Sequence, residues 1–89
     1  MTHTETINFI KRLIAQANAE ADMPVDYTRM DGKLVQVPIG LGFATSGGFM
    51  VKVSPGTTKR HLGFFIDTGR GWESVTRSRF QSVVAVSQR

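Results

Sequence analysis

The sequence predicts a mainly β domain in which one N-terminal helix precedes five or six short strands, and these strands close into a small, strongly bent barrel. The chain has 89 residues, 40% of them apolar, which is enough for one modest core but not for two. Residues 4–21 carry a helical hydrophobic period, and further along the period becomes two, with glycine-rich turns between short runs. We therefore expect a single domain over residues 1–89, with the helix in 4–21 and the barrel in 25–86. An open sheet with the helix on one face is the competing architecture.

The helix is predicted from apolar side chains that recur every three or four residues and so form one stripe. The members of this stripe are Ile7, Ile10, Leu13, Ile14, Ala17 and Ala21. Thr2 or Thr4 can cap the start, and Pro24 ends the element because proline disfavours a helical conformation in the residue before it. We expect the stripe to pack on the body of the domain; a helix that binds a partner or a membrane surface is the alternative.

The first strands are predicted on either side of Asp31-Gly32, a dipeptide typical of tight hairpin turns. Residues 25–28 alternate before it, and residues 35–43 carry an apolar side chain at every second position. Pro38 cannot donate a hydrogen bond to a neighbouring strand, which favours an edge or a bulge there.

The second half of the chain continues the same pattern. Gly40 and Gly42 allow the preceding strand to bend or another backbone to approach it. The remaining elements are expected as a turn at 45–48, a strand at 49–53, an exposed loop at 54–61, a strand at 62–67, a turn at 68–71, a strand at 72–76, a tight turn at 77–80 and a last strand at 81–86.

Charge is distributed unevenly along the chain. Residues 1–31 hold three basic and five acidic side chains, a net charge of −2, whereas residues 32–89 hold eight basic and two acidic ones, a net charge of +6. Such a surplus attracts polyanions, because the summed field raises the local concentration of phosphates. A net charge of this size can also serve solubility alone.

Several classes of site are excluded by composition. The chain has no cysteine, so disulfide frameworks, thiolate metal sites and cysteine nucleophiles are absent. Neither His3 nor His61 has a carboxylate at the spacing of a triad or a metal site, and Gly40-x-Gly42 lacks the rest of a dinucleotide fingerprint. We expect a protein that is not an enzyme and holds no metal or cofactor. No run approaches 18 apolar residues, and the N-terminus does not resemble a secretory signal, so a cytoplasmic protein without a membrane span is expected.

Parts of the sequence resemble two families of small Sm-like barrels. Segments 25–27, 31–32, 37–41 and 47–51 resemble a WYL domain, with Phe49-Met50-Val51 in place of the Trp-Tyr-Leu tripeptide, and residues 76–80 resemble a later stretch of that family. The N-terminal helix and the ending Gln81-Ser82-Val83-Val84 are similar to those of bacterial Sm-like RNA chaperones. Both resemblances imply an Sm-like or SH3-like barrel, and a shared fold does not by itself carry a function.

The candidate functional residues are basic and aromatic. Guanidinium groups suit phosphate oxygens, and exposed aromatic rings give nucleic-acid bases a surface on which to stack. Since alternate loops of a small barrel project from the same end, the basic loop at 59–61 and the turn at 77–79 are expected to converge. The residues predicted to bind nucleic acid or a nucleotide-like ligand are Lys59, Arg60, Arg70, Trp72, Arg77 and Arg79, with Tyr27 as a second stacking candidate. Two plainer interpretations stay open: Trp72 can belong to the core or cover an end of the barrel, and Arg77 and Arg79 can pair with Asp67 or Glu73.

Two kinds of function follow from these residues. The first is a nucleic-acid-binding regulatory or accessory protein. The alternative is a small protein-interaction module, an adaptor or inhibitor of the kind that phages and mobile elements encode, which would act through an edge strand and the exposed aromatics Phe49 and Phe65. A homo-oligomer is compatible with either.

Overall fold

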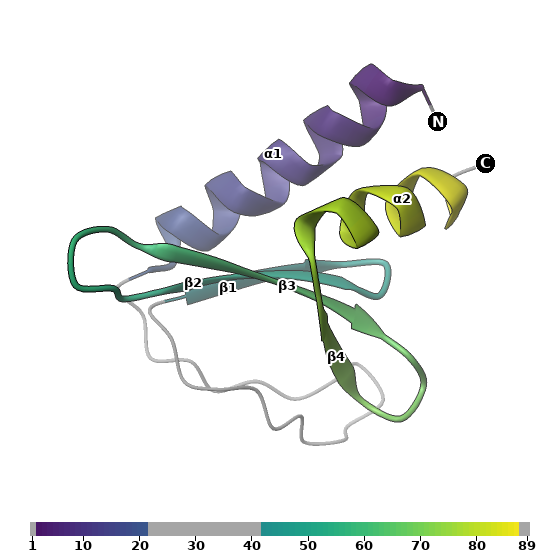
Figure 1. Ribbon diagram of the computed structural model, residues 1–89. Coiled ribbons are helices and arrows are strands. Elements are labelled where there is room, and N and C mark those ends of the chain that lie inside the picture. Colours follow the sequence, from purple (N-terminus) through teal and green to yellow (C-terminus); the bar gives the residue numbers. More distant parts are fainter. Residues whose placement is uncertain (1, 22–41, 88–89) are drawn as a thin grey trace.

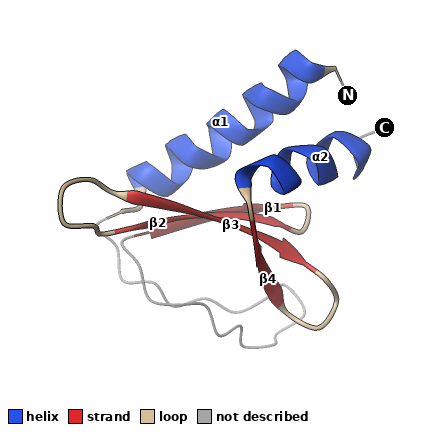
Figure 2. Cartoon of the chain, in the orientation of Figure 1, coloured by secondary structure: helices blue, strands red, loops and turns tan. Residues whose placement is uncertain are grey.

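A computed structural model describes residues 2–21 and 42–87 of the chain. Two helices lie on one face of a four-stranded antiparallel sheet (Figures 1 and 2). In chain order the elements are α1 (His3–Ala19), β1 (Gly42–Ser46), β2 (Phe49–Ser54), β3 (His61–Asp67), β4 (Trp72–Val75) and α2 (Arg77–Ser87).

The N-terminal helix forms as the sequence predicts. The Thr2 hydroxyl accepts a hydrogen bond from the Glu5 N–H at 3.1 Å and so satisfies one of the free donors of the first turn. Glu5 itself lies in that first turn, where a negative charge is favourable. The predicted stripe is buried at Ile10, Leu13 and Ala17, which confirms that the helix packs on the body of the domain.

The four strands follow one another as a meander, each hydrogen-bonded to the next in the order β1-β2-β3-β4. The β1–β2 hairpin turns at Gly47 and Gly48, whose φ angles of 56° and 86° lie in the left-handed region that glycine adopts without strain. At the other end of β2, Ser54 pairs with His61 across the loop 55–60. The loop 68–71 then returns the chain so that Trp72 pairs with Asp67.

The main core lies between the helices and the sheet. Phe80 of α2 is completely buried, and its ring centroid lies 5.6 Å from that of Phe49 and 5.1 Å from that of Phe64. Phe9 of α1 meets the Phe49 ring from the other side at 6.1 Å. The other members of this core are Ile10, Leu13, Ala17, Ala44, Val51, Val53 and Val84.

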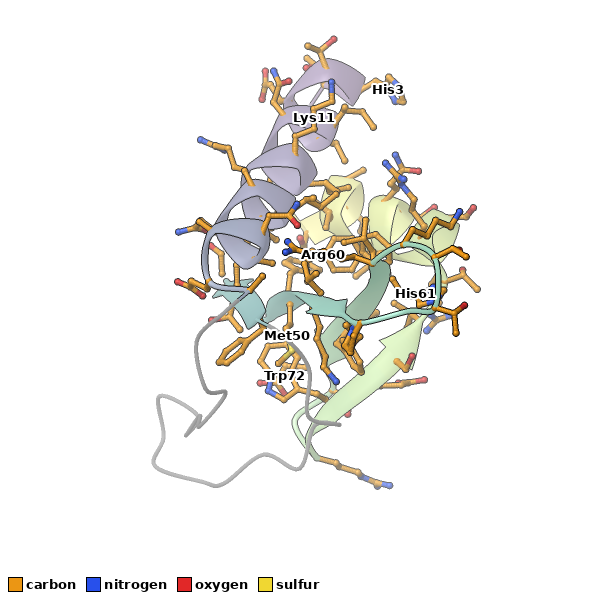
Figure 3. The ribbon with its side chains drawn as sticks, turned by 90° about the vertical axis from the view of Figure 1, so that its left-hand side faces the viewer. His3, Lys11, Met50, Arg60, His61 and Trp72 are labelled. Carbon is orange, nitrogen blue, oxygen red and sulfur yellow. The ribbon has the colours of Figure 1, made fainter. Side chains whose placement is uncertain are left out.

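The opposite face of the sheet carries the alternate residues of the same strands. Met50 is 1% exposed and Lys52 4% exposed, and Phe65 is also buried on this face. Gly63 is required there, because a Cβ at this position would lie 2.9 Å from the Phe65 ring. Figure 3 shows Met50 and Trp72 on the side of the sheet away from the helices.

The predicted barrel is wrong, because the described strands form an open sheet of four and its outer strands β1 and β4 do not pair with each other. The expected tight turn at 77–80 and last strand at 81–86 are also wrong: both belong to α2. Phe80 and Val84 are spaced by one helical turn and are both buried, and Thr76 caps the helix in front of them. A helix here covers the core, whereas a strand would have been needed to close the sheet.

Several of the other expected strands are confirmed, and the rest of the expected features lie outside the described residues. The strands at 49–53, 62–67 and 72–76 correspond to β2, β3 and β4, with ends that differ by one residue. The end of the expected strand 35–43 coincides with the start of β1. The strand at 25–28, the Asp31-Gly32 turn, Pro38 and Gly40 lie outside the described residues.

Candidate nucleic-acid interface

The loop between β2 and β3 presents two of the predicted cations. Lys59 and Arg60 are both exposed in it, and this end of the molecule faces the viewer in Figure 3. Gly56 packs so closely against the Lys59 carbonyl and the His61 imidazole that a Cβ at Gly56 would overlap both. The loop is therefore folded back on itself, which limits the positions open to the two cations.

The first turn of α2 presents two more of the predicted cations, Arg77 and Arg79. The Thr76 hydroxyl caps this helix by accepting the Arg79 N–H at 3.2 Å. The Arg77 guanidinium carbon lies 6.0 Å from the centre of the Phe64 ring, at the outer limit of a cation–π contact, while the side chain stays exposed. The first turn contains no acidic residue. Two positive charges at the positive end of a helix are unfavourable for helix stability, so stability does not explain them.

The register of the sheet places one pair before the start of β3 and the other beside its middle. Phe64 pairs with Val75, and the chain enters α2 two residues later, beside the half of β3 that follows the loop. Arg60 precedes Phe64 by four residues, about 13 Å in an extended strand. We call Lys59, Arg60, Arg77 and Arg79 the basic end.

Arg70 and Trp72 do not belong to the basic end. They lie in and just after the loop 68–71, at the opposite end of β3, where the Asp67 N–H donates to the Gly48 carbonyl at 2.9 Å. Trp72 is half-buried on the sheet face away from the helices. The structure thus places four of the predicted cations between the start and the middle of β3 and separates the fifth, together with the tryptophan, at the end of that strand.

The acidic side chains of residues 42–87 are also segregated. The segment contains six basic and two acidic residues, and the acidic pair, Asp67 and Glu73, lies at the end that carries Arg70. Asp67 accepts a hydrogen bond from the Gly69 N–H at 2.9 Å, and Arg77 contacts the Phe64 ring. Glu20 is at the same end of the sheet as the loop 55–60, but against Gly42 of β1, two strands away from β3.

The aromatics of the alternative hypothesis do not form a docking surface. Phe49 is 4% exposed and Phe65 9% exposed, because each is part of the packing on one face of the sheet. A partner could reach neither ring without disrupting that packing. Tyr27 lies outside the described residues.

Sequence reasoning did not single out Lys52. This side chain alternates with Val51 and Val53 and lies on the sheet face away from the helices, between Phe43 and Gly63 in the register. Burial lowers the pKa of Lys52 below its ordinary value of 10.5, because removing an ammonium group from water disfavours the charged form. A charged residue inside an otherwise apolar alternation is the signal that could have identified it.

A hollow of about 270 Å³ lies between α1 and β1, lined by Gln16, Glu20, Phe43, Ala44 and Thr45. Its charged group is a carboxylate, which disfavours phosphate. No cluster of three or more potential metal ligands occurs among residues 2–21 and 42–87, and neither described helix has the length and hydropathy needed to cross a membrane.

Comparison with protein-family models, with curated proteins and with solved structures finds no match, so nothing identifies the chain with the WYL or Sm-like families. What the protein does must therefore be inferred from the basic end itself.

Proposed function

We propose that this protein binds nucleic acid through the basic end and acts as a cytoplasmic regulatory or accessory factor without enzymatic activity. The observation that carries the proposal is that Lys59, Arg60, Arg77 and Arg79 lie between the start and the middle of β3, whereas the carboxylates of the same segment lie at the end of that strand. Four exposed cations can displace the counterions of a nucleic acid.

The arrangement favours binding over a purely solubilising role. Charges that only keep a protein soluble work equally well when both signs are interspersed over the surface. Here two of the four cations occupy the unfavourable end of a helix, and the other two sit on a loop held by the close packing of Gly56. The charges on the helix lower its stability, and the packing of the loop lowers its conformational freedom. Both costs are useful if an anion binds to these cations.

Fluorescence anisotropy with a labelled nucleic acid of about 20 nucleotides, measured over a salt series, tests the proposal. Four phosphate contacts on a duplex predict a log–log slope of about −3.6 between affinity and salt concentration. The double variants Lys59→Ser/Arg60→Ser and Arg77→Gln/Arg79→Gln should each weaken binding and reduce the slope by about 1.8.

A control double variant on α1 matches their change in charge. Lys11 and Arg12 are exposed on α1, and Figure 3 shows Lys11 well away from Arg60. Lys11→Gln/Arg12→Gln, and the single variant Arg70→Gln, should leave the slope nearly unchanged. Absence of binding at low salt would overturn the proposal. Equal losses in all the variants would also overturn it, because the attraction would then come from net charge and not from the basic end.

A further inference from the structure

We infer that Lys52 is a covalent capture site, at which a small apolar aldehyde forms an imine with the side-chain amine. The site lies on the sheet face away from the helices. It uses none of the residues of the basic end, so it goes beyond the proposed function and does not depend on it. Three observations support it: Lys52 is buried without a partner, its nearest neighbours in the sheet are apolar, and its nitrogen still reaches water.

The first observation is the burial of an unpaired lysine. Lys52 is 4% exposed, although a buried lysine normally pairs with a carboxylate. Among residues 2–21 and 42–87, Lys52 has no hydrogen-bond or ion-pair partner. Burial without a compensating charge disfavours the ammonium form, and it lowers the pKa of Lys52 from its ordinary value. The neutral amine, which burial favours, is the form that attacks a carbonyl carbon.

The second observation is the set of neighbours that the sheet register gives to Lys52. It lies opposite Phe43 of β1 and opposite Gly63 of β3. Met50, two residues earlier on β2, is 1% exposed, and Phe65 is buried at the diagonal position on β3. Side chains related in these ways lie within about 8 Å of one another. These apolar surroundings suit an uncharged aldehyde with a short hydrocarbon body better than an anion.

The charged groups on the same face do not hold Lys52 in its ammonium form. The nearest one in the register is His61, at the other diagonal position on β3, and its imidazole packs against the loop 55–60. Asp67 follows Gly63 by four residues, about 13 Å along an extended strand. The titratable groups of the loop itself are cations, and like charges also favour the neutral amine.

The third observation is that the Lys52 nitrogen is accessible although its alkyl stem is buried. In the described part of the chain, no side-chain nitrogen or oxygen is both enclosed and without a hydrogen-bond partner. Because Lys52 has no such partner, its Nζ atom must reach water. The buried stem holds this atom close to the surface of the sheet, so the site admits a small aldehyde and excludes a bulky one.

The reaction needs no other reagent. The lone pair of the neutral Nζ attacks the carbonyl carbon, and a carbon–nitrogen bond forms. The carbonyl oxygen then leaves as water with the two amine hydrogens, and a carbon–nitrogen double bond remains. Nothing is oxidised or reduced, and the addition of water reverses the step. Lysines in apolar surroundings are suited to this chemistry, because the amine is neutral at a lower pH than in water.

Competitive labelling of the full chain tests the inference. Propanal with sodium cyanoborohydride turns each imine into a stable secondary amine, with the hydride supplied by the reagent. Peptide mass spectrometry compares the labelling rate of Lys52 with those of Lys11 and Lys59, which are exposed lysines of the same chain. At pH 8 Lys52 should be labelled at least about threefold faster than either. The ratio should fall toward one as the pH approaches 10.5.

Unfolding supplies the matched control, since the chain and the reagent stay the same. In concentrated guanidinium chloride the three lysines should be labelled at equal rates, because burial is lost. If Lys52 is labelled no faster than Lys11 and Lys59 in the folded protein, the inference is wrong. It is also wrong if Lys52 keeps its lead in the unfolded chain, because the reactivity would then come from the local sequence and not from the sheet.

Discussion

Replacing Gly42 with alanine should loosen the junction between α1 and the sheet. A Cβ at Gly42 would overlap the Glu20 carbonyl oxygen and lie 2.5 Å from its carbon and 2.7 Å from the Ala21 nitrogen. All three are backbone atoms and cannot rotate away. To restore an ordinary contact of 3.4 Å, the end of α1 must move from β1 by about 1 Å, which separates the Ala17 and Ala44 layers of the core.

The magnitude follows from two opposing effects. Forcing a methyl group into a packed site costs about 1–3 kcal/mol. Alanine also reduces the freedom of the unfolded chain, which offsets about 0.4–1 kcal/mol. We therefore expect Gly42→Ala to lower the free energy of unfolding by about 1–2 kcal/mol, equivalent to a Tm lower by about 5–15 °C in a domain of this size.

Thermal and urea unfolding, followed by far-ultraviolet circular dichroism, measure the effect. Gly47→Asn is the matched control, since Gly47 has a φ of 56° that asparagine tolerates and no atom lies within 4 Å of its Cβ position. It should change stability by less than about 0.5 kcal/mol. A Gly42→Ala protein as stable as the original chain would refute the close approach of the two backbones.

Three further substitutions probe other parts of the fold. Phe80→Ala removes a completely buried ring that lies 5.1 Å from Phe64 and should cost about 3–5 kcal/mol; an unchanged urea midpoint would show that α2 does not pack on the sheet. Thr76→Ala removes the hydroxyl that accepts the Arg79 N–H and should cost about 1 kcal/mol in urea unfolding, whereas Thr76→Ser should retain most of the stability, and equal losses in the two would argue against the cap. Lys52→Met should raise the Tm at neutral pH, because burial lowers the pKa of Lys52 in the folded state and the native protein then holds an ammonium group at a cost. Stability of the original chain should rise as pH passes from the lowered pKa toward the unfolded value of 10.5, and above that pH lysine becomes neutral in both states. The advantage of methionine should shrink over this range; a difference in Tm that stays constant with pH would contradict this.

The elements that could be predicted are those whose pattern is complete within one segment. The stripe of α1 is visible at Ile10, Leu13 and Ala17, because three or four residues make one helical turn regardless of what the helix packs against. The strands β2 and β3 alternate for the same local reason. Gly42 was expected to allow either a bend or the approach of another backbone, and the backbone of Glu20, the residue that follows α1, lies against it.

The C-terminal helix could not be predicted in this way. Its segment contains Val83, Val84 and Val86, β-branched residues that are common in strands. Only Phe80 and Val84 are buried, and two positions are too few to distinguish a period of 3.6 from a short strand. Phe80 packs against the rings of Phe49 and Phe64, and this packing favours the helix over a strand. Both rings come from other elements of the fold.

The candidate site shows the same division. Composition alone establishes that residues 32–89 carry a net charge of +6 and that the chain has no cysteine. Successive loops of an antiparallel meander project from opposite ends of the sheet, which is why the loop 55–60 lies at one end and Arg70 at the other, and the short β4 then starts α2 beside the middle of β3. Sequence periodicity determines which side chains face inward within each strand, because it depends only on neighbouring residues. Whether the strands close into a barrel or stay open beneath two helices depends on contacts between distant segments, and only the tertiary structure decides it.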